Sequence, residues 1–320
     1  MENVIVMAVG HHHIFHLVAP TVAKAKGWFE EGGIKNYQFH ITGTDEDTLT
    51  GMKEGKIHIG LDPKPILLIN EFCKGERFYI IAGWLNKPPF CLVGAKGINS
   101  LSDLKGKRIG SRETGGIDAL QMKNFLRFHG IDPEREIELV ISGMNSRAQQ
   151  KPLLDNGTLQ AAMVIRRDAL RMTEEGYKIL ADFAEIYPEG FPQRVIAVTE
   201  QFLRENSSLI KPFLKAMIRA YRMMNQNYEE TYSIICKAVD RGELKWDRDI
   251  DHELWKTKYP FFDAIPADGM VALKGLETLV EEQKKAGTIP ESFRIEDILR
   301  LEFVREAAKE VNDLFGQGYE

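Results

Sequence analysis

The stretch of sequence that best predicts the fold is Leu101-Ser-Asp-Leu-Lys-Gly-Lys-Arg-Ile-Gly-Ser-Arg-Glu-Thr-Gly-Gly116. Its middle, Lys107–Ser111, predicts a brief strand. Residues 113–116 predict the loop that opens a helix running to about His129. A strand, a glycine-containing loop and a helix in direct succession are typical of one βα step of an α/β sheet.

The same loop predicts an exposed helix N-terminus that could hold an anion. Thr114 is the predicted N-cap, and the small residues Gly115 and Gly116 leave the first free backbone N–H groups uncovered. These groups and the positive end of the helix dipole favour a carboxylate, phosphate or sulfonate. We therefore expect ligand contacts from Glu113, Thr114, Gly115 and Gly116. The alternative is that the glycines only make a tight turn between strand and helix.

The composition is that of an ordinary globular protein. The chain has 320 residues, of which 43% are hydrophobic and 28% charged, and its net charge is −5. This net charge gives no indication of binding to nucleic acid. No apolar run approaches the roughly 18 residues needed to span a membrane. Cys73, Cys91 and Cys236 are widely spaced and form no metal motif, so we expect buried free thiols.

Strands and helices are predicted to alternate along most of the chain, which favours an α/β fold with parallel-rich sheets and helices on both faces. Expected strands cover residues 4–9, 38–42, 57–61, 78–84, 90–93, 107–111, 137–142, 159–165, 177–181 and 195–199. Expected helices cover residues 16–28, 45–54, 63–73, 117–129, 146–155 and 166–174, and the remainder after residue 200 is mostly helical.

The order of these elements predicts two α/β units that the chain joins twice, near residues 84–90 and 194–199. One lobe then comprises residues 1–86 and 200–320, and the other residues 90–195. In open α/β sheets ligands bind outside the carboxyl ends of the strands. We therefore expect a ligand cleft between the lobes, lined by the loops that follow the strands.

Four of the eight histidines, His11, His12, His13 and His16, lie within six residues after the first predicted strand. Neutral imidazoles could hydrogen-bond a polar ligand, and charged ones could attract an anion because histidine titrates near neutrality. His12, His13 and His16 could instead bind a transition metal, with a carboxylate from elsewhere. The remaining alternative is a structural cluster at the start of a helix.

Other candidates follow later strands. Asp62 could accept a hydrogen bond from a ligand or cap the helix that follows it. Trp84 could stack on a ligand ring in the cleft or fill the hinge. Arg166 could clamp a carboxylate, although one of two adjacent arginines usually faces solvent. Asn145 lies in the loop of residues 143–146 and is a further expected ligand contact.

Four blocks of sequence, taken together, resemble the substrate-binding proteins of ABC importers. Within that group the chain is similar to the branch that binds sulfonates, nitrate, taurine and thiamine-pyrimidine precursors. The resemblance implies a two-lobed, type II periplasmic-binding-protein-like fold that closes around one ligand. The blocks are residues 23–34 (AKAKGWFEEGGI), 51–60 (GMKEGKIHIG), 101–116 and 202–225.

The chain also resembles the thiamine-pyrimidine synthases, which are enzymes on the same fold. That family has a cofactor lysine in a Gly-Leu-Lys sequence, whereas this chain has Gly60-Leu-Asp62, with Lys64 two positions on. It also has a cysteine-rich run where this chain reads Phe191-Pro-Gln-Arg-Val-Ile-Ala197. Both departures argue against this chemistry. A cytoplasmic enzyme acting on a small aromatic or heterocyclic acid, including a decarboxylase-like one, remains the alternative.

We therefore expect a binding protein for one small organic ligand, anionic and aromatic or heterocyclic, rather than an enzyme. The expected partner is an ABC permease; we expect a monomer, no nucleic acid and no cofactor, with the metal at the histidines left open. The location implied by the resemblance is periplasmic or extracytoplasmic, with a leader removed. A cytoplasmic location stays open, because Met1-Glu-Asn leads directly into a strand without a signal peptide.

Overall fold

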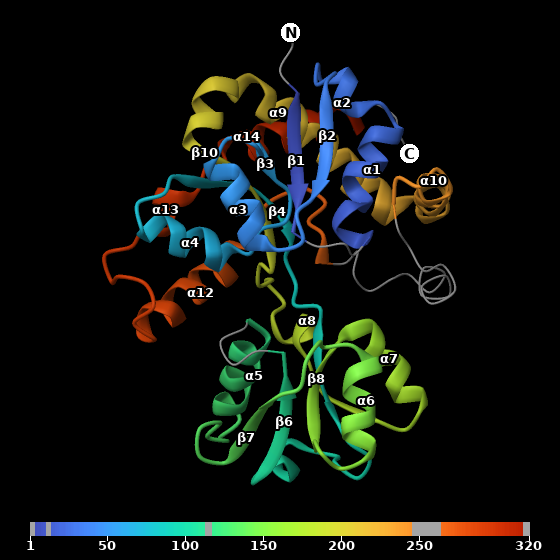
Figure 1. Cartoon of the computed structure of the whole chain (residues 1–320), viewed down its shortest axis with the longest axis vertical. Helices are drawn as coiled ribbons and strands as arrows, with labels where there is room; N and C mark the ends of the chain where they lie inside the picture. The colour runs from blue at the N-terminus through green and yellow to red at the C-terminus, as the bar shows by residue number, and fades with distance from the viewer. Residues whose placement is uncertain (1–3, 11–13, 113–116, 245–263, 316–320) are drawn as a thin grey trace. The chain divides into compact units, whose positions relative to one another are not determined.

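The computed structural model describes residues 4–10, 14–112, 117–244 and 264–315, which form two compact α/β units (Figure 1). Within these ranges, the first unit takes the residues up to Asn86, those from Phe191 to 244 and those from Ile265 onward, and the second takes the residues from Lys87 to Gly190 and Ala264. The chain thus re-enters the first unit at Phe191. This is slightly before the expected 194–199, because that segment is itself a strand of the first unit's sheet.

The first unit is built on a five-stranded sheet in the order β2-β1-β3-β10-β4. Strands β1 and β2 are parallel, as are β1 and β3, whereas β10 is antiparallel to both of its neighbours, β3 and β4. The strands are β1 (Ile5–Val9), β2 (Tyr37–Ile41), β3 (Ile59–Gly60), β4 (Phe78–Leu85) and β10 (Arg194–Thr199).

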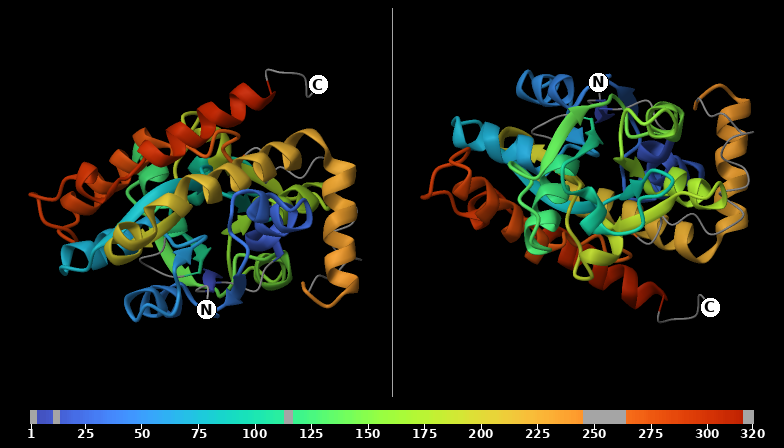
Figure 2. Two further views of the ribbon diagram at one scale, coloured as in Figure 1. Left: turned by 90° about the horizontal axis from the view of Figure 1, so that it is seen from above. Right: turned by 90° about the horizontal axis from the view of Figure 1, so that it is seen from below.

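Helices flank this sheet because each has one apolar side to bury. The long α9 (Glu200–Gln226) buries Phe202, Phe213, Met217 and Tyr221 and lies alongside α14 (Glu302–Phe315) in the left view of Figure 2. The other helices of the unit are η1 (Ile14–Leu17), α1 (Val18–Ala25), α2 (Trp28–Glu31), α3 (Asp45–Lys53), α4 (Pro65–Cys73), α10 (Tyr228–Asp240), α12 (Leu273–Lys285) and α13 (Ile295–Ile298).

The second unit repeats the plan in the order β7-β6-β8-β5-β9. Here β6 runs parallel to β7 and β8, and β5 is antiparallel to β8 and β9. The strands are β5 (Phe90–Gly94), β6 (Lys107–Ser111), β7 (Ile137–Ile141), β8 (Ala161–Ile165) and β9 (Lys178–Asp182). The helices are η2 (Leu101–Leu104), α5 (Ile117–Phe128), α6 (Arg147–Asp155), α7 (Arg166–Glu174) and α8 (Phe183–Ile186).

Successive residues of the central strands of this unit feed two apolar cores, as the alternation of a pleated strand requires. Leu92 packs with Met122 and Leu126 of α5, whereas Val93 packs with residues of α6 and α7. Helix α5 therefore covers one face of the sheet, and α6 and α7 cover the other.

Two expectations need correction. The helix expected over residues 16–28 is interrupted at Gly27, whose φ of 70° is a left-handed conformation that ends α1 before α2 begins. The cysteines, all within the described part of the chain, form no disulfide, but only Cys91 is buried and Cys73 is exposed. Burial raises the pKa of the Cys91 thiol, which favours its neutral form.

Candidate functional site

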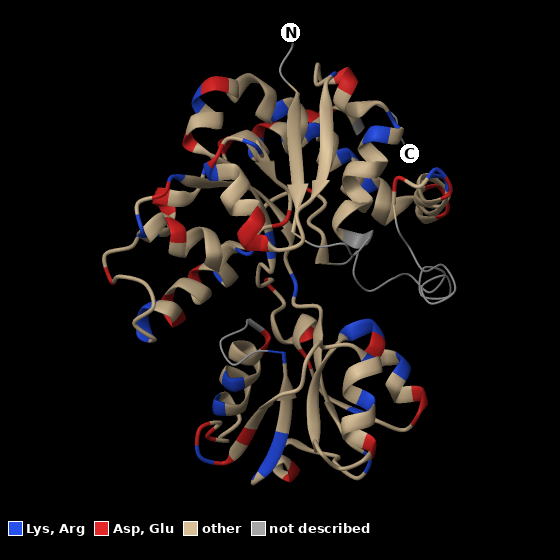
Figure 3. Ribbon diagram, in the orientation of Figure 1, with Lys and Arg blue, Asp and Glu red and all other residues tan. Residues whose placement is uncertain are grey.

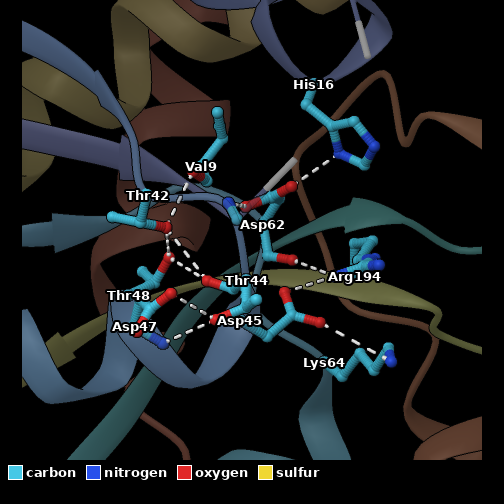
Figure 4. Close-up of polar contacts among 11 residues, drawn as sticks. Val9, His16, Thr42, Thr44, Asp45, Asp47, Thr48, Asp62, Lys64 and Arg194 are labelled. Atoms are coloured by element: carbon cyan, nitrogen blue, oxygen red, sulfur yellow. Dashed lines mark hydrogen bonds and ion pairs between the residues drawn. The ribbon is translucent and has the colours of Figure 1, made fainter. Parts of the chain in front are cut away.

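A cluster of charged side chains lies at the carboxyl ends of β1 and β3 in the first unit (Figure 4). We call it the Asp45–Asp62 cluster. Both carboxylates are buried, Asp45 at 2% exposure and Asp62 at 0%. The basic side chains against them are more exposed, at 11% for Arg194, 21% for Lys64 and 15% for His16. The buried part of the cluster is thus acidic, and its more accessible part is basic.

The side chain of Asp62 contacts both Gly10, which follows β1, and His16 of η1. Its Oδ1 accepts a hydrogen bond from the backbone N–H of Gly10 at 3.0 Å, and its Oδ2 lies 2.5 Å from Nδ1 of His16. The capping alternative for Asp62 is wrong, because α4 begins at Pro65 with Lys64 at its N-cap position.

The charge of Asp62 is set by opposing effects. Burial raises the pKa of this carboxyl, but the His16 imidazole and the Arg194 guanidinium nearby lower it more, so that the pKa lies below the ordinary 3.8. The carboxylate is therefore ionised at neutral pH. Its negative charge stabilises positive charge on the neighbouring basic groups.

Asp45 holds the other half of the cluster. Its Oδ1 accepts from Nη1 of Arg194 at 2.6 Å, and its Oδ2 lies 3.6 Å from Nζ of Lys64. The same Nη1 donates to the backbone oxygen of Asp62 at 2.9 Å. Arg194, the first residue of β10, therefore connects this strand to the first turn of α3 and to the loop that follows β3.

Neighbouring threonines fix the position of Asp45 at the start of α3. Thr44 caps α3, since its hydroxyl accepts the backbone N–H of Asp47 at 3.0 Å. Thr42 and Thr48 pack their hydroxyls 2.6 Å apart behind it. Asp45 then occupies the first turn of α3, where the helix dipole stabilises a negative charge.

In the second unit, polar groups gather where β6, β7 and β8 end. Oδ2 of Asp118 accepts hydrogen bonds from Oγ of Ser111 at 3.0 Å, from Nδ2 of Asn145 at 2.7 Å and from the backbone N–H of Arg112 at 3.4 Å. The backbone oxygen of Asn145 accepts from the N–H of Ile165 at 2.7 Å. Asn145, a predicted ligand contact, is thus fixed at this end of the sheet.

Two other predicted contacts have partners within their own unit. Arg166 donates from Nε to Asp182 at 2.7 Å and from Nη2 to Glu185 at 3.2 Å, so its guanidinium already binds two carboxylates. Trp84 is 2% exposed, and its ring stacks on Tyr221 with centroids 5.4 Å apart. Trp84 is therefore packed inside the first unit, and its contact with a ligand ring stays a prediction.

The remaining predicted residues, His11, His12, His13, Glu113, Thr114, Gly115 and Gly116, lie outside the described residues. Their ligand contacts stay predictions, and so does a metal at the histidines. Within the described residues, no group of three His, Cys, Asp or Glu side chains could hold a metal ion. No helix in the described part is long and apolar enough to cross a membrane. Charges of both signs are interspersed over each unit (Figure 3).

Sequence reasoning missed Asp45, Arg194 and Asp118 as members of these clusters. In the sequence, Asp45 is only the first residue of the expected helix over 45–54, and Arg194 only the first residue of the expected connection near 194–199. Each is drawn into its cluster by a residue distant in sequence, such as Asp45 by Arg194 across 149 positions. Arg194 begins β10, whereas Asp45 and Asp118 lie in the first turns of α3 and α5, so no shared local pattern marked the three residues.

Two mixed α/β sheets, each with one reversed strand that follows a change of unit, define the class of periplasmic-binding-protein folds. The NMT1/THI5-like family model matches residues 16–231, and the chain belongs to that family. A curated relative, YtlA of Bacillus subtilis (strain 168), carries the name of a binding protein. It is 23% identical over 308 residues, covering 93% of this chain and 88% of YtlA.

Solved structures share the fold over nearly the whole chain. The periplasmic aliphatic sulphonate-binding protein SsuA from Escherichia coli aligns with a TM-score of 0.68 at 14% identity, covering 94% of this chain and 92% of SsuA. The periplasmic nitrate-binding protein NrtA from Synechocystis PCC 6803 aligns with a TM-score of 0.62 at 13% identity, covering 96% and 88%.

Proposed function

We propose that this chain is the solute-binding component of an ABC importer and binds one small organic anion. Family membership and the similarity to binding proteins for sulphonate and nitrate support the class. The observation that carries the choice of an anion is the Asp45–Asp62 cluster. Its carboxylates are buried, and its basic groups are the more accessible part.

The charge balance of the cluster explains the preference. Asp45 accepts a hydrogen bond from Arg194 at 2.6 Å and lies 3.6 Å from Nζ of Lys64, and Asp62 lies 2.5 Å from Nδ1 of His16, so the two carboxylates hold these side chains in place. A solute anion would then meet basic groups that are already positioned. This saves the cost of ordering them at the moment of binding.

An aromatic or heterocyclic body on the anion, an ABC permease as partner, a monomeric state and an extracytoplasmic location complete the proposal. The proposal needs no cofactor or metal. Solute supplied in excess over the protein should be recovered intact after incubation, because a binding protein releases what it binds. Mass spectrometry of the recovered solute checks this, and turnover beyond one equivalent would move the protein to the enzyme class.

The test of the anion site is calorimetric titration with ethanesulfonate, benzenesulfonate and nitrate, each against the purified chain. Lys64→Met removes one basic group at the edge of the cluster, and we expect affinity for the preferred anion to fall at least fivefold. Lys56→Met is the matched control, because Lys56 is 75% exposed and pairs only with Glu54 among the described contacts. Equal affinity in both variants would place the anion elsewhere.

A further inference from the structure

Three side-chain amides in the second unit, those of Gln121, Asn145 and Gln150, are buried without a full set of hydrogen-bond partners among the described residues. Gln121 of α5 is 1% exposed, and neither its Nε2 nor its Oε1 has a partner among the described residues. Asn145 is 4% exposed, and its Oδ1 is likewise unpartnered within the described part. Buried polar atoms in native proteins nearly always have a partner, and leaving one without costs stability. These atoms therefore call for a partner beyond the described residues.

The amides of Gln121 and Asn145 flank one carboxylate. Nδ2 of Asn145 donates to Asp118 at 2.7 Å, and Gln121 lies three positions after Asp118 on α5, where helical residues are neighbours. The amide nitrogen of Asn145 faces Asp118 in this hydrogen bond, so the amide oxygen faces another direction. Its oxygen is then left as an acceptor for a donor that the described residues do not supply.

The free atoms of these two amides are mostly hydrogen-bond acceptors, so the missing partner should be a hydrogen-bond donor. Asn145 and Gln121 together offer two acceptor oxygens and one N–H₂ donor beside the Asp118 carboxylate. The three donors that the described residues give to Asp118 come from a hydroxyl, an amide and a backbone N–H, all of them neutral. An amine or ammonium group would supply both the missing donors and a favourable positive charge.

A third buried amide differs in an informative way. Gln150 is 0% exposed, and its Oε1 also has no partner among the described residues, but its Nε2 donates to the backbone oxygens of Met144 at 2.8 Å and Ser142 at 3.3 Å. Its amide nitrogen holds the loop before α6 in place, so this side chain contributes to stability. It therefore provides an internal control for the unpartnered Gln121.

We propose that Asn145 and Gln121 form a hydrogen-bonding subsite that selects solutes carrying an amine or another N–H donor. The inference rests on the proposed function, since it takes a small solute as the occupant. It assigns to Gln121 a role in solute specificity that the sequence did not suggest. It also specifies that Asn145, a predicted ligand contact, would accept a hydrogen bond from an N–H group of the solute.

The first arm of the test is stability. Gln121→Met replaces the unpartnered amide by an apolar side chain of similar shape, and we expect its thermal midpoint to equal or exceed that of the parent. Gln150→Met should lower the midpoint, because it removes two hydrogen bonds to the backbone. If Gln121→Met is destabilised as strongly as Gln150→Met, the amide is structural and the proposal is overturned.

The second arm is selectivity, measured by calorimetry with taurine and ethanesulfonate, which differ by one amino group. We expect the parent to bind taurine at least tenfold more tightly, and Gln121→Met and Asn145→Leu to lose this preference while keeping their affinity for ethanesulfonate. Equal binding of the two probes by the parent, or an unchanged ratio in Gln121→Met, would mean that water alone fills the subsite and would overturn the proposal. If the parent binds neither probe nor any other anion tested, the proposed function fails, and the stability arm still decides the subsite.

Discussion

The Asp62 carboxylate is buried completely in the first unit, yet it remains ionised because its neighbours outweigh the cost of burial. It accepts the N–H of Gly10 and lies against His16, while Arg194 donates to its backbone oxygen. A buried charge that keeps its partners stabilises little by itself, but removing one partner leaves the others uncompensated. Asp62 is therefore a residue on which both the fold and the candidate site depend.

Replacing Asp62 by Asn should make this dependence measurable. The amide oxygen can still accept from Gly10, but the charge beside His16 and Arg194 is lost, and we expect the free energy of unfolding to fall by about 3 kcal/mol at pH 7. The folded-state pKa of Asp62 is lowered, so its contribution is complete above 3.8 and is lost as the pH falls through the folded-state pKa. Urea unfolding at several pH values should show the two proteins converging only below pH 3.8.

Asp47→Asn is the control for that experiment. Asp47 is exposed and accepts from the Thr44 hydroxyl at 2.7 Å in the same helix turn, so its replacement should cost less than about 0.5 kcal/mol. A loss at Asp62 no larger than this would show that the carboxylate is not needed for stability and that its role belongs to binding alone.

At the scale of elements, the approach of α3 to the end of β1 is what brings Asp45 and Asp62 together. Gly10 permits this approach, because a Cβ at that position would lie 2.9 Å from both the backbone N and Oδ1 of Asp45. Part of that obstruction is backbone, which cannot rotate away. The contact between these two elements therefore requires glycine.

Gly10→Ala should accordingly push α3 away from β1, and we expect a loss of about 1–3 kcal/mol of stability with weakened anion binding. Gly60→Ala is the matched control, since its Cβ would meet the flexible Met52 sulfur at 2.9 Å and the Met52 side chain can move aside. Denaturant unfolding of both variants compares the two costs. An equal and small cost at both positions would show that α3 tolerates displacement.

The elements also show what sequence can and cannot predict. Strand β6 and helix α7 have the predicted bounds, because hydrophobic pattern and helix signals are local. Strand β3 forms only Ile59–Gly60 of the expected 57–61. The ladder partners of a strand lie far away in sequence, so its length is decided by pairing and not by its own residues. For the same reason, the sequence did not predict that β5 and β10 run antiparallel to their neighbours. It did not predict the partners of Asp45 either.

At the scale of the whole molecule, the second unit is an insertion into the first. The backbone oxygen of Asn86 accepts from the N–H of Phe191 at 2.6 Å, and that of Leu85 from Gln193 at 2.7 Å. Strands β4 and β10 are antiparallel neighbours. The first unit is thus continuous across the insertion in hydrogen bonding, although not in sequence, and each unit has its own sheet and core.

This arrangement predicts that the two units fold independently. Joining Asn86 to Phe191 through two glycines, with residues 87–190 deleted, converts β4 and β10 into a hairpin whose ends already meet. We expect this protein and the excised 87–190 segment each to unfold cooperatively in urea and to give dispersed amide resonances, since each retains a complete sheet and its covering helices. The joined protein should also keep the Asp45–Asp62 cluster, whose described members all lie in the first unit. A non-cooperative transition in either piece would show that its core is completed by the other unit.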